Sequence, residues 1–121
     1  MVDGLGNLVR FSLWPGQRHD SVGALDLIDS LTFEALLGDK AFDNNAIRDD
    51  LEQRCAEAVI PSKADRKQPI PHDQHKYRWR HVIENYFSKI KDFRSVNTRY
   101  DKTELSYKAT ITLAAIVIAL R

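Results

Sequence analysis

The sequence predicts a mixed α/β fold, and three observations support this prediction. Short apolar runs alternate with amphipathic segments over residues 1–60, which is typical of strands joined by helices. A polar, basic stretch at 61–76 is broken by prolines and is predicted to be a loop. Two later segments, 77–93 and 103–120, have the apolar content and periodicity of helices. The length of 121 residues allows one domain or a piece of one.

Three apolar runs predict the strands of a small sheet. The first extends from Leu8 to Trp14 and ends in a Pro-Gly turn. The second is FEALLGD, which places Asp39 at the end of a buried strand. The third is AEAVIPSK, which Pro61 ends. Because three strands make a small sheet with little cover, we expect the chain to be the latter part of a larger fold.

Two helices are predicted between these strands, each with a capping residue at its start. An Asp-Ser pair at 20–21 can cap SVGALDLIDSL, and an Asp-Asn-Asn run at 43–45 can cap AIRDDLEQRC. The alternation of strands and helices suggests a mixed α/β layer with at least one crossover unit. The final helix over 103–120 is apolar around much of its circumference, so we expect it to pack against the sheet or a partner.

Charge is distributed unevenly along the chain despite a formal net charge of +1. Residues 20–60 contain ten acidic and three basic side chains, whereas residues 61–102 contain eleven basic and five acidic ones. A basic half can bind nucleic acid, although a solvated surface of mixed sign gives the same counts. The three histidines of that half lack the spacing of a zinc site.

Other features exclude several classes of protein. The single cysteine, Cys55, rules out an internal disulfide framework and is expected to be a small packing residue. The apolar run at 109–120 is too short to span a membrane, and Met1 is not followed by a signal peptide. We therefore expect a cytoplasmic protein, in which Trp14 and Trp79 are core aromatics.

Two acidic residues are candidates for chemistry. Asp39 follows a predicted buried strand, and Glu84 lies on the helix predicted over 77–93. Carboxylates from a strand end and a neighbouring helix are suited to hold Mg²⁺ or Mn²⁺. In the simpler interpretation, Asp39 starts a turn and Glu84 pairs with Arg80 or Lys91. The residues alone leave both interpretations open.

Charged and apolar side chains fall on different sides of the helix YRWRHVIENYFSKIK. At about 100° per residue, Tyr77, Arg80, Glu84 and Lys91 lie within an arc of roughly 60° around the helix axis. The apolar side is the one expected to pack. The charged side consists of Tyr77, Arg80, Glu84 and Lys91, and the apolar side of Trp79, Val82, Ile83, Tyr86, Ile90 and Phe93.

The motifs of this chain resemble the C-terminal half of bacterial insertion-sequence transposases of the DDE class. The matching segments are GDKAFD, AVIPSK, YRWRHVIENYFSKIKDFR and TRYDK, and DGLGNLVRFSLWPGQRHD upstream also looks like the family. The family signature is a Tyr, an Arg after two intervening residues, a Glu after three more and a Lys after six more. Tyr77, Arg80, Glu84 and Lys91 have this spacing. The resemblance covers essentially the whole chain.

The resemblance implies a partial RNase H-like fold, a three-layer α/β/α arrangement without the N-terminal strand that carries the first catalytic Asp. Asp39 matches the second acid and Glu84 the third acid of a site that holds two Mg²⁺ (or Mn²⁺) ions. The implied reaction is hydrolysis of a phosphodiester at an insertion-sequence end, followed by attack of the freed 3′-hydroxyl on target DNA.

The resemblance also implies contacts with the phosphates of double-stranded DNA. Arg80 and Lys91 would meet phosphate oxygens and Tyr77 would position the backbone, while Arg94 and Arg99 are expected to add contacts from the following basic segment. Contacts of this kind are sensitive to salt and largely independent of base sequence. The loop at 61–76 is a further candidate for DNA contact, or a solvated loop.

The chain departs from the family pattern before its first strand. Asp3 and Asp20 are the only acids before Asp26, and neither matches the first catalytic acid, so we expect weak metal binding and little cleavage by the chain alone. One hypothesis is a transposase, or the second-frame product of a split transposase gene. The second is a non-catalytic DNA-binding or regulatory remnant that forms a homodimer or joins full-length transposase through an exposed sheet edge. A third, a small soluble α/β protein with no nucleic-acid partner, leaves the face shared by Arg80, Glu84 and Lys91 unexplained. The first two would act in the bacterial cytoplasm, at the nucleoid when bound to DNA.

Overall fold

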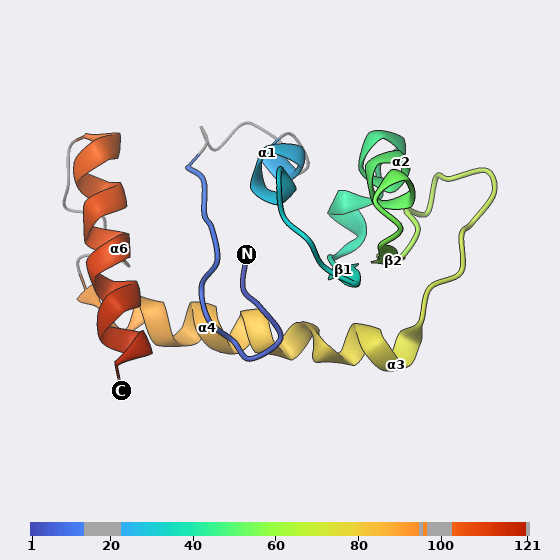
Figure 1. Cartoon of the computed structure of the whole chain (residues 1–121). Coiled ribbons are helices and arrows are strands. Elements are labelled where there is room, and N and C mark those ends of the chain that lie inside the picture. Colours follow the sequence, from blue (N-terminus) through green and yellow to red (C-terminus); the bar gives the residue numbers. More distant parts are fainter. Residues whose placement is uncertain (14–22, 95, 97–102, 121) are drawn as a thin grey trace. The chain divides into compact units, whose positions relative to one another are not determined.

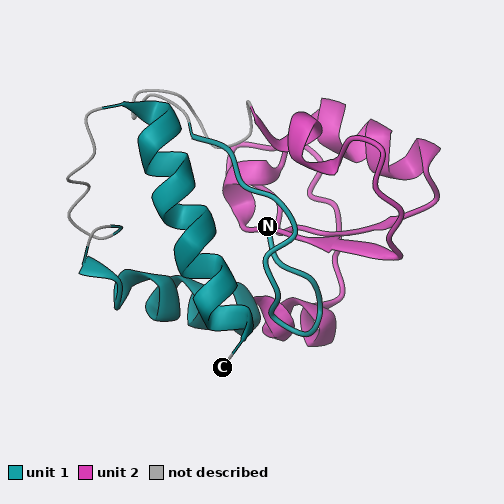
Figure 2. Ribbon diagram, turned by 60° about the vertical axis from the view of Figure 1, so that its left-hand side comes forward, with its two compact units in different colours: residues 1–13, 81–121 teal, residues 14–80 magenta. Residues whose placement is uncertain are grey.

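The structure is a computed structural model, and it describes residues 1–13, 23–94, 96 and 103–120 (Figure 1). The described residues form two compact units (Figure 2). Unit 1 consists of residues 1–13 and 81–121, and unit 2 of residues 14–80. The elements, in chain order, are α1 (Ala24–Ile28), β1 (Ala35–Leu37), the 3₁₀ turn η2 (Lys40–Phe42), α2 (Asn45–Gln53), β2 (Glu57–Val59), α3 (Gln74–Tyr77), the 3₁₀ turn η3 (Arg78–Arg80), α4 (His81–Lys91) and α6 (Glu104–Ala119).

The strands of unit 2 confirm the predicted crossover. β1 and β2 pair in parallel, with Leu36 opposite Ala58 at the centre of the register. Parallel neighbours require a connection that returns to the same end of the sheet, and α2 provides it. The described part of the chain is therefore mixed α/β, as the alternating pattern predicted.

The core of unit 2 lies where α2 meets the sheet. Ile47 and Leu51, four residues apart on α2, are each 1% exposed, and Val59 of β2 is fully buried. Residues four apart share one helix face, so both side chains point to the same side of α2, the side that is buried. Burying an aliphatic side chain of this size contributes about 1.5–3 kcal/mol. Asn44 begins the helix, because its Oδ1 accepts a hydrogen bond of 2.7 Å from the N–H of Ala46.

The apolar run at 8–14 does not form the predicted strand in residues 8–13, and Trp14 lies outside the described residues. Only an isolated antiparallel bridge joins Val2 to Leu8 in this described segment. Between them the carboxylate of Asp3 accepts hydrogen bonds of 2.9 Å from the N–H groups of Leu5 and Asn7, which closes a turn. The apolar side chains of the run instead pack against the helices of unit 1. Burial of apolar side chains does not require strand pairing, so these side chains are removed from water although the backbone forms no hydrogen-bonded strand ladder.

Unit 1 is built around a cluster shared by α4 and α6. Its buried members are Tyr86 and Ile90 of α4 and Ile111 and Ala114 of α6, together with Val96. The Thr103 hydroxyl caps α6 by accepting a hydrogen bond of 3.1 Å from the N–H of Ser106. The helix predicted over 103–120 is thus confirmed within one residue at each end. None of the described helices, α6 included, has the length and apolar content to cross a membrane.

The helix predicted over 77–93 begins earlier and is interrupted. Asp73 caps α3 by accepting hydrogen bonds from the N–H groups of His75 (2.9 Å) and Lys76 (3.0 Å), so helical structure starts at Gln74. The 3₁₀ turn η3 then precedes α4, which ends at Lys91. The prediction missed Asp73 because the preceding prolines favoured a loop.

Two side chains that were expected to pack are exposed. Trp79, in η3, is 57% exposed, so its assignment to the packed side is wrong. Cys55 is also exposed, and its φ of 58° lies in the left-handed region. There the N–H of Cys55 donates to the carbonyl of Glu52 at 3.0 Å, and the next N–H donates to Leu51 at 2.9 Å. Cys55 therefore ends α2, a position that glycine usually takes.

Candidate functional site

Asp39 lies at the carboxyl end of β1, as predicted. It follows Gly38 and is half-buried, and its Oδ1 accepts a hydrogen bond of 2.9 Å from the N–H of Ala41. Asp39 thus begins the 3₁₀ turn η2, and the interpretation of Asp39 as a turn residue is confirmed. The second carboxylate oxygen, Oδ2, accepts no hydrogen bond from the residues that the structure describes, so a capping role and a role as metal ligand are compatible.

Glu84 lies on α4 and its side chain is exposed. It belongs to unit 1, whereas Asp39 belongs to unit 2. Carboxylate oxygens are the donors that Mg²⁺ and Mn²⁺ prefer, so both residues have suitable chemistry. Over residues 1–13, 23–94, 96 and 103–120, however, no three His, Cys, Asp or Glu side chains gather into a group that could hold an ion. The metal site therefore stays a prediction.

Tyr77 and Arg80 come together in unit 2. Arg80 Nη1 donates a hydrogen bond of 2.8 Å to the Tyr77 hydroxyl oxygen, and the guanidinium carbon lies 5.6 Å from the centre of the Tyr77 ring. The ring of His72 meets Tyr77 edge-on, with the ring centres 5.3 Å apart. The three-residue spacing of the sequence motif therefore produces a contact, and it holds the guanidinium in a defined place.

The remaining cations of the motif are on or after α4. Lys91 is the last residue of α4 and is exposed, and Arg94 is exposed as well. Arg99 lies outside the described residues. Exposed cations are able to meet phosphate oxygens, but no contact with another described residue distinguishes Lys91 and Arg94 from other surface cations.

The structure adds one acidic residue that the sequence prediction treated only as part of a helix cap. Asp43 is 3% exposed and accepts four hydrogen bonds. Arg66 donates two, from Nη2 at 2.7 Å and from Nε at 2.9 Å. Arg48 Nε and the N–H of Lys63 each donate one at 2.7 Å. These four residues are called the Asp43 network below.

The charge of Asp43 is stabilised by its neighbours. Burial by itself opposes the ionised form, but the hydrogen bonds from Arg66, the Lys63 N–H and Arg48 outweigh it. The pKa of Asp43 therefore lies well below the usual range of an aspartate. A carboxylate with this many donors is ionised at neutral pH and neutralises much of the charge of both arginines.

The Asp43 network fixes the first part of the basic loop. Lys63 and Arg66 are bound to Asp43, and the Ser62 hydroxyl bonds both the N–H (2.8 Å) and the carbonyl (3.1 Å) of Ile70. The segment 62–70 is therefore a turn closed by hydrogen bonds, although most of its residues are exposed, so DNA contact and a solvated loop both stay open for it. No sequence rule could find this arrangement, because Asp43 and its partners on the loop are separated by 20 and 23 positions.

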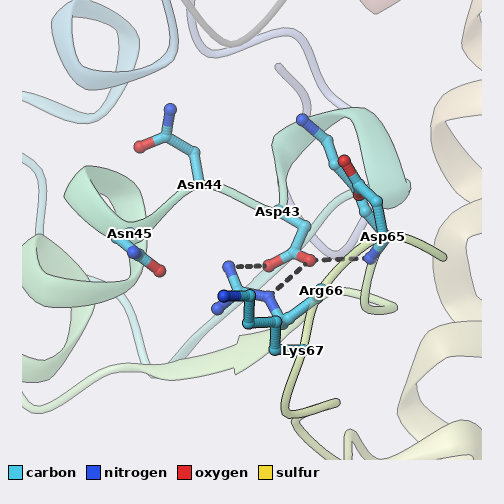
Figure 3. Close-up of a pocket in the computed structure, with 7 residues that line it drawn as sticks. Asp43, Asn44, Asn45, Asp65, Arg66 and Lys67 are labelled. Carbon is cyan, nitrogen blue, oxygen red and sulfur yellow. Dashed lines mark hydrogen bonds and ion pairs between the residues drawn. The ribbon is translucent and has the colours of Figure 1, made fainter.

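A shallow pocket of about 500 Å³ lies beside this network (Figure 3). It is formed by the start of α2 and by the turn at 62–70, and the side chains that line it are polar or charged. We call it the basic pocket. Its lining residues are Asp43, Asn44, Asn45, Lys63, Asp65, Arg66 and Lys67.

Comparison with known proteins places these observations in a family. The family model described as "Transposase DDE domain" matches residues 1–120. A relative from Brucella ovis, described as "Putative transposase for insertion sequence element IS6501", is 29% identical over 123 residues. That alignment covers all of this chain and 95% of the relative. No solved structure matches the chain.

Proposed function

Because the chain belongs to the DDE transposase family of insertion sequences, whose function is DNA transposition, we propose that it acts on DNA phosphodiesters at insertion-sequence ends. The observation that carries this proposal is the family match over residues 1–120, which includes the complete Tyr77–Lys91 motif. The parallel unit of β1, α2 and β2 agrees with the RNase H-like fold that the family implies. The three-layer arrangement is part of the proposal.

In this proposal Asp39 and Glu84 are the metal ligands. The position of Asp39 at the carboxyl end of a parallel strand supports its role, because ligands in α/β sheets gather at that end. Two bound Mg²⁺ (or Mn²⁺) ions would supply Lewis acidity for phosphodiester cleavage and strand transfer. The contribution of the chain itself is to place carboxylate oxygens: Asp39 from a rigid turn, and Glu84 from a helix.

The proposed DNA contacts are those of Tyr77, Arg80, Lys91, Arg94 and Arg99. The Arg80 guanidinium is the best supported of them, since its bond to Tyr77 and its place beside the ring hold it in position. A positioned guanidinium loses less side-chain entropy when it meets a phosphate than a free one does. Double-stranded DNA is accordingly the proposed partner, bound mainly through its backbone.

The test measures metal-dependent DNA cleavage and DNA affinity separately in variants of the two proposed metal ligands. Glu84→Gln and Asp39→Asn remove one charge each and keep the shape of the side chain. With the upstream segment that carries the first catalytic Asp supplied, both variants are expected to lower Mg²⁺-dependent cleavage of a duplex carrying the element's end by at least about 100-fold, while DNA affinity changes less than about twofold. Asp49→Asn, which changes an exposed carboxylate on α2, is the control. Equal loss of cleavage and affinity in the two variants would reject the ligand assignment.

A second readout does not depend on cleavage. Bound Mn²⁺ can be counted from the loss of its free electron-paramagnetic-resonance signal. The wild-type chain with DNA is expected to bind Mn²⁺ at least tenfold more tightly than either carboxylate variant. Identical Mn²⁺ binding by all three proteins would contradict the proposed site.

The second candidate function is that of a non-catalytic DNA-binding or regulatory protein, acting as a homodimer or with full-length transposase. The observation that supports it is the excess of eleven basic over five acidic side chains in residues 61–102. This candidate predicts DNA binding that is unchanged when Mg²⁺ is removed, with no cleavage under any metal condition. Metal-dependent cleavage that Glu84→Gln abolishes would reject it.

A further inference from the structure

We propose that the basic pocket binds a phosphate of the DNA backbone, through Lys63 and Lys67, and that Asp43 is the positioning residue that holds this site together. The proposal rests on the proposed function, since it takes DNA as the partner. It adds a contact outside the Tyr77–Lys91 motif, on a segment that the motif does not include.

The first argument is the balance of charge around the pocket. Asp43 is buried and already paired with Arg48 and Arg66, so its carboxylate is not available to attract other cations. The pocket therefore has an excess of positive charge from Lys63 and Lys67, both exposed, opposed by the carboxylate of Asp65. Neither lysine side chain forms an ion pair within the part of the chain that the structure describes. An anionic ligand could form an ion pair with both lysine side chains.

The second argument is preorganisation. The N–H of Lys63 is bonded to Asp43 at 2.7 Å, which fixes the backbone from which the Lys63 side chain extends. Lys67 directly follows Arg66, which makes two hydrogen bonds to the same carboxylate. The two lysines thus extend from a fixed turn, and less order has to be created on binding. Without Asp43, Arg66 and the Lys63 N–H would lose the carboxylate that accepts hydrogen bonds from both of them.

The third argument concerns the class of ligand. The pocket is shallow and is lined by charged and amide side chains, with Asn44 and Asn45 at its other side (Figure 3). Aromatic and aliphatic residues are absent from its lining as described, so the pocket offers no surface on which a base could stack. Lysine and amide donors suit the oxygens of a phosphodiester, which can be reached from outside while its sugars stay in solvent. The contact is therefore independent of base sequence.

The experiment measures binding of the full chain to a 25-base-pair duplex over a range of salt concentrations. The test variant is Lys63→Gln/Lys67→Gln, and Lys40→Gln/Lys108→Gln, which changes two other lysines, is the control of equal charge. The test variant is expected to bind about tenfold more weakly at low salt. Its slope of log affinity against log salt should be shallower by about 0.9, the value for one lost phosphate contact. The control should keep the wild-type slope.

The possible failures are distinguishable. If wild-type chain binds DNA and the test variant keeps the wild-type slope, the pocket contact is wrong and the proposed function stands. If wild-type chain does not bind DNA even at low salt, both are wrong. Inorganic phosphate added at constant ionic strength should compete with DNA for the wild-type chain and not for the test variant, because the proposed site takes a phosphate group. Phosphate binding that depends on Lys63 and Lys67 but leaves DNA affinity unchanged would assign the pocket to a small phosphate ligand and overturn the DNA contact.

The positioning role of Asp43 has its own readout. Arg66→Lys keeps the charge of the turn but cannot make both hydrogen bonds to the carboxylate. This variant should weaken DNA binding with an unchanged salt slope, because the lysine contacts persist while the site becomes less ordered. Binding equal to wild type would show that the network does not position the pocket.

Discussion

In unit 2 the buried carboxylate of Asp43 accepts four hydrogen bonds, whereas in unit 1 the buried hydroxyl of Tyr86 has no hydrogen-bond partner among the residues that the structure describes. Burial also raises the pKa of the Tyr86 hydroxyl and so keeps it neutral. A charge cannot be buried unless it is paired, but a neutral hydroxyl can be buried unpaired at a modest cost. Both units therefore have an apolar core, and unit 2 in addition buries a charged group within a polar network.

The largest expected effect comes from removing the centre of the Asp43 network. Asp43→Ala should lower the free energy of unfolding by about 3 kcal/mol, because Arg48 and Arg66 would keep partly buried charges without their shared partner. Urea unfolding at pH 7 measures the loss. Asp49→Ala, at an exposed carboxylate on α2, should change the same quantity by less than about 0.5 kcal/mol. A loss in Asp43→Ala as small as in this control would show that unit 2 does not depend on its network.

A smaller effect is expected from acid. Because the pKa of Asp43 is lowered in the folded state, the stability it contributes is complete above the unfolded value of about 4 and is lost as the pH falls below it toward the folded value. Urea midpoints measured between pH 7 and pH 3 test this. Asp43→Asn cannot ionise and should lose less stability over that range. Parallel losses in both proteins would mean that other carboxylates cause the acid sensitivity.

The smallest effects are expected in unit 1, where two tyrosines offer a matched pair. Tyr86→Phe removes a buried hydroxyl without a described partner, so it should leave the stability unchanged or raise it by up to about 1 kcal/mol. Tyr107→Phe removes a hydroxyl that donates a 2.7 Å hydrogen bond to the carbonyl of Val96, and should cost about 1 kcal/mol. Thermal unfolding of both variants measures the difference. A loss in Tyr86→Phe equal to that in Tyr107→Phe would show that Tyr86 has a partner.

The candidate site was predictable only in part. Asp39 at the end of β1 and the contact between Tyr77 and Arg80 follow from local order and from a three-residue spacing. The basic pocket does not follow from any spacing, because Asp43 and Arg66 are 23 positions apart. The roles of Asp39 and Glu84 as metal ligands stay predictions.

The sequence by itself determined the cap of α2 within residues 43–45, the extent of α6 to within one residue at each end, and the presence of a crossover unit. These features depend on interactions between residues close in the chain, or on the regular spacing of apolar residues along a helix or strand. Tertiary structure alone decided that the described part of the run from Leu8 packs against the unit 1 cluster with only a single bridge to Val2, and that Asp43 binds Lys63 and Arg66 of the basic loop. Both outcomes depend on which distant groups meet, since a backbone ladder and a buried charge each need a partner that local sequence does not specify.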